Sequence, residues 1–360
     1  MRVVAAMSGG VDSSVAAALL AEAGHEVIGL SMQLYDQSEG QTGFGTCCTI
    51  DDLHDARRVA HRLNIPHYIV NFEREFQRTV VANFVDEYVA GRTPIPCSHC
   101  NSDLKFATLL ERARGFNADF VATGHYAQVE TDSVSGRRVL RRGLDHGKDQ
   151  SYFLFALTQA QLASAHFPVG NLTKDAVRDL ARGLGLSVAE KPDSQEICFV
   201  PDGDYAAFIE RHAGSPGQTG DIPRDGAIVN QSGEVLGRHG GVHRFTVGQR
   251  KGLGIALAEP MYVLELRSAD QTVVVGARPE LERTSMTASQ VNWIAGEPPM
   301  GVLRVTAQIR HRHHPAPATV RAIESGGAAV EFETPQMAIT PGQAVVFYDG
   351  DIVLGGGWID

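Results

Sequence analysis

The sequence predicts an α/β fold, in which a doubly wound, Rossmann-like parallel sheet is followed by two small β-rich domains, the last of them barrel-like. Three observations lead to this prediction. Strand-like apolar stretches alternate with helical patterns through roughly the first 200 residues, a glycine-rich turn follows the first strand, and helical periodicity fades near Gly214. The expected domains are residues 1–212, 213–278 and 279–360.

The individual elements follow from local patterns. Apolar stretches predict strands at residues 3–7, 26–33, 67–70 and 119–123, and periodic apolar positions predict helices at residues 13–23, 51–63, 74–90 and 102–114. A later helix, residues 174–183, has Thr173 as its expected N-cap. Beyond Gly214, short strands are expected at residues 227–230, 261–266 and 272–276, and a second β-rich unit runs from about residue 280 onward.

The turn after the first strand, MSGGVDSS at residues 7–14, carries the strongest functional signal. A strand, a Gly-Gly turn and a helix start form a cradle for an anion, because glycine lets the backbone approach a phosphate and the helix start offers unpaired N–H groups. The hydroxyls of Ser13 and Ser14 are expected to add donors. This turn contains neither a Walker-type G-x-x-x-x-G-K-[ST] nor a G-x-G-x-x-G, so nucleotide binding of another kind is favoured over an ordinary strand–helix turn.

Length and composition limit the class of protein. A chain of 360 residues exceeds what one hydrophobic core usually organises. No apolar run approaches the roughly 18 residues of a membrane span, and Met1-Arg2 leads directly into a core strand, so we expect no signal peptide and a cytoplasmic location. The five cysteines are then expected to be reduced, and any pairing among them is more often catalytic or metal-related than structural.

The formal net charge of −10 gives no general support for nucleic-acid binding, but two stretches are locally basic. Strand alternation over residues 303–312 places a set of polar and basic side chains on one face. This face is either a solvated strand surface or a phosphate-binding one. The members of that face are Arg304, Thr306, Gln308, Arg310 and Arg312, and the other basic stretch holds Arg137, Arg138, Arg141, Arg142 and Lys148.

Three cysteines leave several kinds of site open. Cys97 and Cys100 lie between the end of one predicted helix and the start of another, and Cys198 is distant in sequence. A helix N-terminus lowers a thiol pKa, which suits Cys100 to act as a thiolate. One hypothesis is that the cysteines are simply small buried residues, and this is favoured for Cys47 and Cys48. A zinc site that His99 and Cys198 could complete is weakly supported. The other two hypotheses are an iron–sulfur cluster on Cys97, Cys100 and Cys198 and a thiol relay that passes a persulfide.

A series of sequence blocks resembles the tRNA-specific 2-thiouridylases, a group of ATP pyrophosphatases with a pyrophosphate-binding loop. The resemblance extends over essentially the whole chain. Amide-forming synthetases share the ATP loop but have no need of the last block. The blocks are SGGVDSS at 8–14, GRTP at 91–94 with CN at 100–101 and KF at 105–106, ATGHY at 122–126, KDQSYF at 148–153, DSQEICF at 193–199 and FTVGQRKGLG at 245–254.

The resemblance implies thiolation of the wobble uridine of certain tRNAs at C2. The uridine O2 attacks the α-phosphate of ATP, with Mg²⁺ expected, and gives an adenylated base and pyrophosphate. Cys198 carries a persulfide that a cysteine desulfurase or sulfur-relay protein supplies, and Cys100 is the nucleophile that releases the sulfur, leaving a Cys100–Cys198 disulfide to be reduced. No membrane partner is expected.

The resemblance also implies binding residues. The implied ATP-binding residues are Ala6, Met7, Ser8, Gly9, Gly10, Val11, Asp12, Ser13, Met32 and Gly124. The implied tRNA-binding residues are Ile95, Pro96, Cys97, His125, Lys148, Asp149, Gln150, Arg310, His311 and Gln343.

Two positions sit uneasily with the resemblance. Some members carry Asp where this chain has Cys97, so an acid–base role for that carboxylate is in doubt here, and the cluster hypothesis gains a third thiolate. Strand alternation turns His311 away from the arginine face unless a bulge intervenes. An ATP-dependent amide-forming synthetase and an RNA-binding module with an inactive nucleotide site are the remaining alternatives.

Overall fold

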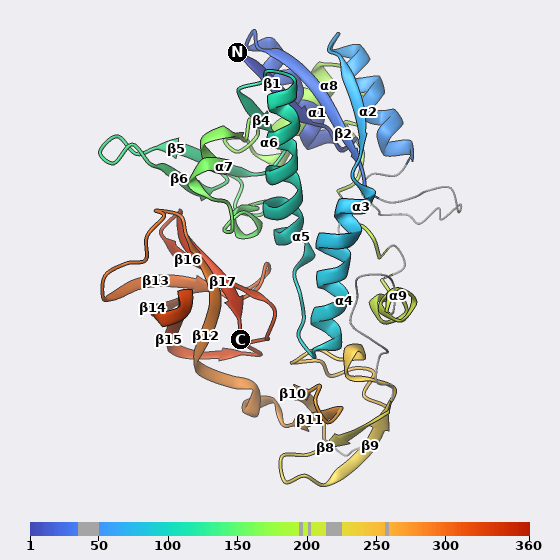
Figure 1. Ribbon diagram of the computed structural model, residues 1–360, viewed down its shortest axis with the longest axis vertical. Coiled ribbons are helices and arrows are strands. Elements are labelled where there is room, and N and C mark those ends of the chain that lie inside the picture. The colour runs from blue at the N-terminus through green and yellow to red at the C-terminus, as the bar shows by residue number, and fades with distance from the viewer. Residues whose placement is uncertain (35–49, 194–196, 201–202, 214–224, 256–258) are drawn as a thin grey trace.

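The computed structural model of the protein describes residues 1–34, 50–193, 197–200, 203–213, 225–255 and 259–360 (Figure 1). Cys47 and Cys48 lie outside the described residues, and so do residues 214–224, where helical periodicity was expected to fade. Within the part of the chain that is described, every helix is too short or too polar to cross a membrane.

A five-stranded parallel sheet organises the first part of the chain. Its spatial order is β3-β2-β1-β4-β7, and the first four strands were predicted. The order reverses direction on either side of β1, which confirms the doubly wound class. The strands are β1 (Arg2–Ala6), β2 (Glu26–Gln33), β3 (His67–Asn71), β4 (Phe120–Ala122) and β7 (Ala165–His166).

Alternating side chains of the strands build two hydrophobic layers. On β1, Val3 and Ala5 join the core on one face and Val4 joins the core on the other. The first face is covered by α1 (Val11–Glu22), α2 (Ile50–Arg62) and α8 (Lys174–Gly183). The second face is covered by α3 (Glu73–Phe76), α4 (Ala82–Val89), α6 (Phe106–Gly115) and α9 (Tyr205–His212).

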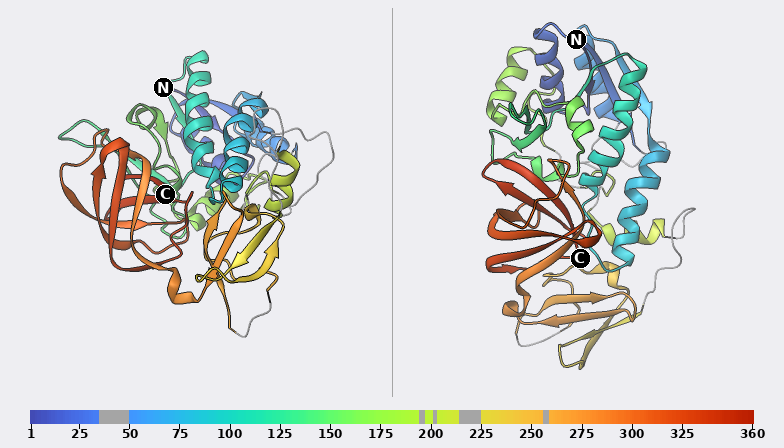
Figure 2. Two further views of the ribbon diagram at one scale, coloured as in Figure 1. Left: turned by 60° about the horizontal axis from the view of Figure 1, so that its bottom comes forward. Right: turned by 60° about the vertical axis from the view of Figure 1, so that its left-hand side comes forward.

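Two long helices on that second face each contain a π-helical segment. The predicted helix 74–90 is a continuous run in which η1 (Gln77–Val81) joins α3 to α4, and α5 (Pro96–His99) and η2 (Cys100–Lys105) lead into α6. The helix predicted to begin at residue 102 therefore begins at Pro96, whose fixed φ suits a first helical position. The two π segments contact each other, and the helices run side by side away from the sheet (Figures 1 and 2).

The remainder of the chain is β-rich, as predicted. Strands β8 (Gly226–Val229), β9 (Val235–His239), β10 (Tyr262–Arg267) and β11 (Thr272–Gly276) form a mixed sheet in the order β10-β11-β8-β9. The last part closes into an antiparallel barrel in the order β12-β15-β14-β13-β16-β17, because β12 also pairs with β17. Its strands are β12 (Glu282–Trp293), β13 (Val302–Gln308), β14 (Ala316–Ile323), β15 (Gly327–Met337), β16 (Ala344–Asp349) and β17 (Ile352–Ile359).

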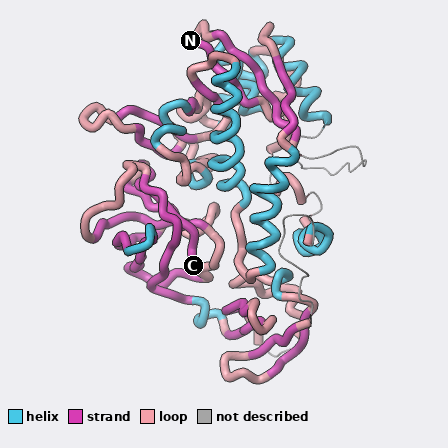
Figure 3. The backbone as a smooth tube through the Cα atoms, in the orientation of Figure 1, coloured by secondary structure: helices cyan, strands magenta, loops and turns pink. Residues whose placement is uncertain are grey.

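A hairpin from the α/β part extends the barrel sheet. Strand β6 (Arg138–Arg142) pairs with β17 and with β5 (Ala127–Thr131), so the hairpin lies between the two parts (Figure 3). Leu140 and Tyr152 share one hydrophobic cluster with Ile294 and Tyr348 of the barrel. The α/β part and the barrel therefore share a core. The remaining elements are α7 (Gln159–Ser164), η3 (Ser151–Phe153), η4 (Val242–Arg244), η5 (Arg278–Leu281) and η6 (Glu324–Gly326).

Candidate active site

The glycine-rich loop at the carboxyl end of β1 has the geometry of an anion cradle. Gly9 has φ of +79°, and Gly10 is the N-cap of α1 with no side-chain capping bond. The first N–H groups of a helix have no intrahelical acceptor, so this helix start presents donors and a positive dipole end. The helix begins at Val11, two residues earlier than predicted. A bound phosphate would therefore meet backbone N–H groups directly.

The two serines of the loop have different surroundings. The Ser13 Oγ accepts a 3.2 Å hydrogen bond from the Ser8 N–H and lies 3.2 Å from the Ser8 Oγ. Ser14 is fully buried, and its hydroxyl donates to the Gly10 carbonyl at 2.8 Å. The Ser13 hydroxyl also donates to the Gly10 carbonyl, at 3.2 Å, so both hydroxyls close the first helical turn, and their donation to a phosphate remains a prediction.

Backbone from two other segments packs directly on the loop. A Cβ on Gly9 would lie 2.7 Å from the carbonyl carbon of Asp52, and one on Gly124 would lie 2.5 Å from the Ser13 nitrogen. Real Cβ atoms essentially never approach this closely, so both positions require glycine. Gly124, which the resemblance assigns to ATP, thus lies against the start of α1. Met32, also assigned there, is on β2, the strand next to β1.

Lys191 ties the loop to α2. Its Nζ donates to the Gly9 carbonyl at 3.0 Å and to carboxylate oxygens of Asp52 at 2.5 Å and Asp55 at 2.6 Å. Burial would lower the pKa of Lys191, but its hydrogen bonds to Asp52 and Asp55 raise it above the ordinary value. Lys191 is thus a charged side chain that holds the loop against α2.

A second lysine holds the acidic residue of the loop. The Lys174 Nζ lies 2.8 Å from both carboxylate oxygens of Asp12 and 2.7 Å from Oδ1 of Asp193. The Tyr126 hydroxyl donates to Asp12 Oδ1 at 2.7 Å, and Lys148 donates to Asp193 Oδ2 at 2.7 Å. Burial and the neighbouring Asp12 carboxylate raise the pKa of Tyr126, so that its hydroxyl remains a donor.

The cysteines occupy three different environments. Cys100 is buried at the start of the π segment η2 and belongs to the hydrophobic cluster on the second face of the sheet. Cys198 is partly buried and packs against that same cluster, whereas Cys97 is exposed. The fold therefore brings Cys100 and Cys198, which are distant in sequence, to one core. No group of three His, Cys, Asp or Glu side chains suited to a metal occurs among the described residues.

The segment that precedes the cysteine helix is held by both β-rich parts. The Thr93 N–H donates to the Pro341 carbonyl at 2.8 Å, and Gln343 Nε2 donates to the Thr93 carbonyl at 2.8 Å. The Thr93 hydroxyl donates to that of Thr246 at 3.3 Å. Gln343, which the resemblance assigns to tRNA, therefore already supports the chain leading into the helix that carries Cys100.

A stacked ring pair adds a further contact between the cysteine helix and the barrel. The rings of His99 and Trp358 are parallel within 7°, with centroids 4.3 Å apart. The Nδ1 of His99 lies 2.9 Å from a carboxylate oxygen of Asp103 one turn along the helix. His99 is therefore held between the barrel and its own helix, which orients the first turn beside Cys100.

Of the positions assigned to tRNA, several make bonds within the chain. Asp149 is buried, accepts from the Arg142 guanidinium at 2.8 Å and accepts from the Ser151 hydroxyl at 2.9 Å. Gln150 Oε1 accepts from the Tyr126 N–H at 3.0 Å. These bonds order the turn that presents Lys148. Ile95 and Pro96 are also buried, at the start of the cysteine helix.

His125 lies at the carboxyl end of β4, as its place after Thr-Gly suggested. Its Nδ1 is 2.7 Å from the Thr123 hydroxyl, and its ring approaches those of Phe106 and Phe167. Burial, together with the charge of Lys105, lowers the pKa of His125 to about 3. The imidazole is therefore neutral at physiological pH.

The alternating face expected over residues 303–312 does not extend that far. Strand β13 ends at Gln308, and the chain turns at Arg310 and His311. Gln308 is buried and donates to the carbonyls of both residues, which stabilises the turn. The ring of His311 lies 4.5 Å from that of Phe153. The turn, rather than a bulge, places His311 beside the KDQSYF block.

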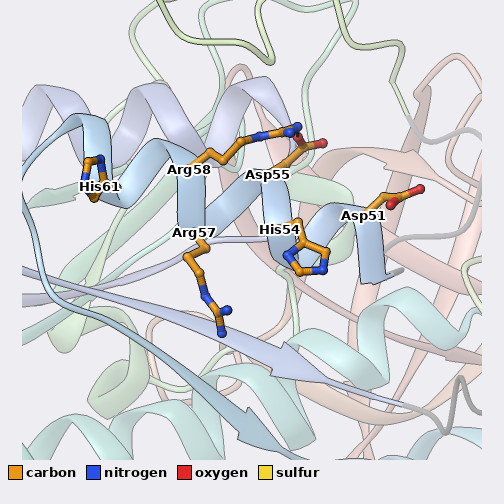
Figure 4. A pocket seen from close by; sticks show the side chains of 6 residues that line it. All are labelled: Asp51, His54, Asp55, Arg57, Arg58 and His61. Atoms are coloured by element: carbon orange, nitrogen blue, oxygen red, sulfur yellow. Dashed lines mark hydrogen bonds and ion pairs between the residues drawn. The ribbon is translucent and has the colours of Figure 1, made fainter.

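Several residues of this site carry no signal in the sequence that singles them out. Lys174 is only the first residue of a helix, and Arg142 is one of several arginines. Lys191 precedes the DSQEICF block by two residues, which is a signal that could have found it. A separate open pocket lies along α2 and is lined by Asp51, His54, Asp55, Arg57, Arg58 and His61 (Figure 4).

That pocket adjoins the loop through Asp55, which accepts from the same Lys191 that donates to the Gly9 carbonyl. Arg58 reaches Asp55 along the helix, while His54 and Arg57 point to another side of α2 (Figure 4). The backbone of α2 also meets the loop, because Asp52 packs on Gly9.

Comparison with known proteins gives consistent matches along the chain. A family model described as "tRNA methyl transferase HUP domain" matches residues 1–202. Models described as "tRNA methyl transferase PRC-barrel domain" and "Aminomethyltransferase beta-barrel domain" match residues 218–277 and 283–359.

Full-length relatives are also found. A protein of Geotalea uraniireducens (strain Rf4), named tRNA-specific 2-thiouridylase MnmA, is 56% identical over 364 residues, which cover 100% of this chain and 95% of the relative. A protein of the same name from Geobacter metallireducens is 54% identical over 364 residues, covering 100% of this chain and 96% of the relative. Another from Koribacter versatilis is 50% identical over 365 residues, covering 99% of this chain and 98% of the relative.

Proposed function

The chain belongs to the tRNA-specific 2-thiouridylase MnmA family, and from that premise we propose how its residues carry out an ATP-dependent transfer of sulfur to a tRNA uridine. The main support for the proposal is that the anion-binding loop and the two cysteines lie against the same sheet. The anion cradle lies at the carboxyl end of β1, and Cys100 and Cys198 pack on the core beneath the same strands. Activation and sulfur transfer are thus served by one scaffold.

We assign the first step to the loop. ATP is bound by the segment from Ala6 to Ser13 together with Met32 and Gly124. The uridine O2 attacks the α-phosphate, a new O–P bond forms, and pyrophosphate leaves with its bonding electron pair. Backbone N–H groups at the start of α1 stabilise the charge on the departing phosphates. The adenylated oxygen can then leave C2 as AMP.

The described residues fit a Mg²⁺ ion only as a companion of the nucleotide. Magnesium usually retains water and takes one or two carboxylates plus substrate phosphates. The one carboxylate of the loop, Asp12, is already paired with Lys174 and Tyr126, and the described part of the chain holds no ready-made group of three ligands. When bound with ATP, the ion would neutralise phosphate charge.

The second step is assigned to the cysteines. A persulfide donor, which we infer to be a cysteine desulfurase or a sulfur-relay protein, loads Cys198. The Cys100 thiolate attacks the Cys198 sulfur, so that a Cys100–Cys198 disulfide forms and the terminal sulfur leaves as sulfide with the electron pair. Sulfide attacks C2 of the uridine and displaces AMP. An external thiol then reduces the disulfide and completes the cycle.

The arrangement of the thiols favours this relay over an iron–sulfur cluster. Cys97 is exposed while Cys100 is buried, and the three cysteines are not among any metal-suited group of the described residues. A cluster needs its ligands to converge on one metal centre. The residues present do not fit the cluster, and we assign it no step.

We propose that the substrate, a tRNA with a modifiable wobble uridine, meets the residues that surround the cysteine helix. Lys148 and Arg310 supply positive charge to phosphates, and neutral His125 and His311 supply rings and hydrogen bonds. Asp149 and Gln150 contribute by ordering the turn that presents Lys148. The full proposed set is Ile95, Pro96, Cys97, His125, Lys148, Asp149, Gln150, Arg310, His311 and Gln343.

Mass spectrometry of tRNA after incubation with ATP and a persulfide source tests the proposal. We expect 2-thiouridine with the intact chain, and none with either Cys100→Ser or Cys198→Ser. Cys97→Ala should retain product if the relay is correct. Lack of 2-thiouridine with the intact chain would overturn the assignment. Unchanged turnover of Cys100→Ser would point to an amide synthetase, and no pyrophosphate release would point to an inactive RNA-binding module.

A further inference from the structure

Ser31, on β2, places a hydroxyl inside the core next to the nucleotide loop at residues 7–14. The residue is 1% exposed, and its Oγ donates to the Met7 carbonyl at 2.6 Å. The Nε2 of His67, on β3, lies 2.8 Å from the same Oγ. A buried hydroxyl is costly unless it is hydrogen-bonded, and these two bonds join β3, β2 and the residue that opens the loop.

The hydrogen atoms of these two bonds have one consistent arrangement. A carbonyl can only accept, so the single hydrogen of the Ser31 hydroxyl points to Met7. His67 must then donate from Nε2 to the Ser31 Oγ. The Nδ1 of His67 is buried without a hydrogen-bond partner among the described residues, which suits the ring nitrogen that carries no hydrogen. Burial, together with the charge of Arg57, lowers the pKa of His67, so the imidazole is neutral at physiological pH.

Gly29 leaves room for both partners of Ser31. Side chains alternate along a strand, so residues 29 and 31 face the same side of β2. A Cβ on Gly29 would lie 2.7 Å from the Met7 Sδ and 3.1 Å from the His67 Cδ2. Met7 and the His67 ring therefore occupy the space that a side chain at residue 29 would fill, and both are held beside the Ser31 hydroxyl.

The bond from Ser31 fixes the first peptide unit of the nucleotide loop. The Met7 N–H donates to the Leu30 carbonyl at 2.8 Å, next to the last paired residues of β1 and β2. The following peptide, between Met7 and Ser8, has its carbonyl held by Ser31. The N–H of that peptide donates to the Ser13 Oγ at 3.2 Å. A rotation of the peptide would break both bonds, so the direction of the Ser8 N–H depends on the Ser31 hydroxyl.

We propose that Ser31 is a positioning residue for the two phosphates of ATP that leave as pyrophosphate, and that His67 orients its hydroxyl. The proposal rests on the proposed function for the identity of the nucleotide. Ser31 is buried, so it acts through the Met7 carbonyl and not by contact with the ligand. A loop whose first peptide is already oriented loses less conformational freedom when it binds a polyphosphate, and its affinity is correspondingly higher.

Calorimetric titration of the full-length protein with α,β-methylene-ATP and with AMP tests this role. AMP lacks the two phosphates that the loop is proposed to receive. Ser31→Ala should weaken binding of the analogue by about tenfold, a loss typical of one buried hydrogen bond, and binding of AMP by no more than about twofold. Ser31→Cys retains a weak donor of similar size and should give an intermediate loss.

A double variant tests whether the two side chains act as one unit. His67→Phe keeps a planar ring but removes the donor to Ser31, and it should weaken binding of the analogue by about threefold. Ser31→Ala combined with His67→Phe should bind the analogue as Ser31→Ala alone does, because the same loop contact is already lost. Losses that multiply to about 30-fold in the double variant would overturn the proposal.

Nitrogen-15 NMR of the intact protein, labelled at histidine, tests the arrangement without any change to the loop. The spectrum of His67→Phe identifies the signals of His67. We expect the neutral tautomer with its hydrogen on Nε2. The tautomer with its hydrogen on Nδ1 would overturn the orienting role of His67 even if a variant failed to fold.

Ser98→Ala is the matched control, because Ser98 is also fully buried and its hydroxyl has no hydrogen-bond partner in the described part of the chain. It should leave both affinities unchanged. Equal weakening of the analogue and AMP by Ser31→Ala, or no weakening of either, would overturn this inference. The proposed function would still stand if the intact chain formed 2-thiouridine. Failure of the intact chain to bind the analogue would overturn the proposed function, and this inference with it.

Discussion

Replacing Gly9 by alanine should damage the nucleotide loop through two separate steric effects. Gly9 has φ of +79°, a region that costs a non-glycine residue roughly 1–2 kcal/mol. The new Cβ would also lie 2.7 Å from the Asp52 carbonyl carbon and closer still to its oxygen, so the start of α2 must move away. That movement would disturb the bonds from Lys191 to Gly9 and Asp52.

The combined cost is about 3 kcal/mol, in the range of backbone strain combined with overpacking. For a domain of this size, about 3 kcal/mol corresponds to a fall in Tm of about 6 to 12 °C. The assay is thermal unfolding followed by circular dichroism, read from the first transition because the chain has several domains. The Tm increase that α,β-methylene-ATP produces in the intact chain should be absent from Gly9→Ala.

Gly10→Ala is the matched control. At Gly10 φ is −89°, and an added Cβ meets only the Ser8 hydroxyl at 3.6 Å, which is ordinary contact. Its cost should be about 1 kcal/mol or less, that of a poorer N-cap. Both variants carry the same glycine-to-alanine substitution, but the two positions differ in φ and in their contact with Asp52. Equal melting temperatures for Gly9→Ala and Gly10→Ala would therefore refute the reasoning.

Three further predictions concern residues outside the loop. Asp149→Ala should destabilise the protein without tRNA by about 3 kcal/mol in urea unfolding, because it leaves the mostly buried Arg142 charge unpaired; an effect seen only on tRNA affinity would contradict this. His125, with a pKa of about 3 in the fold and about 6.5 when unfolded, takes up its proton first in the unfolded state, so stability falls as pH drops below about 6.5. Because His125 is partly exposed, the free energy of unfolding of the intact chain should fall by about 1 kcal/mol more than that of His125→Asn between pH 7 and pH 5. Urea unfolding at both pH values measures this difference, and an equal fall in the two proteins would contradict the prediction. Trp358→Ala removes the ring stacked on His99 and should lower kcat for thiolation by about tenfold, with Trp358→Phe near the intact value; equal rates for both variants would argue against a positioning role.

Local patterns predicted most of the sheet and missed some boundaries of the helices and strands. Strands 26–33 and 272–276 were predicted with the bounds that the structure shows, and Thr173 caps α8 by accepting from the Ala176 N–H. The helix that carries Cys100 begins six residues before its predicted start, and β13 ends before the predicted arginine face is complete. In the second case the cause is Gln308, whose bonds to the Arg310 and His311 carbonyls close a turn.

The sequence by itself determined the kinds of chemistry in this protein, because the loop at residues 7–14 and the cysteines at 97, 100 and 198 are recognised from their neighbours in the sequence. A Gly-Gly turn between a strand and a helix brings unpaired backbone N–H groups close to any anion that binds there. The helix that starts at Pro96 likewise carries Cys97 and Cys100 near its beginning. These features could be recognised without knowing what lies across the fold.

Only the tertiary structure decided how those chemistries are joined. Lys174 meets Asp12 from 162 residues away, and Lys191 meets Asp52 from 139 residues away. The hairpin of β5 and β6 pairs with the barrel, and Asp149 is buried beside Arg142 of that hairpin. Such pairings depend on which charges are desolvated together, and burial of that kind is a property of the packed chain. No local pattern of residues encodes it.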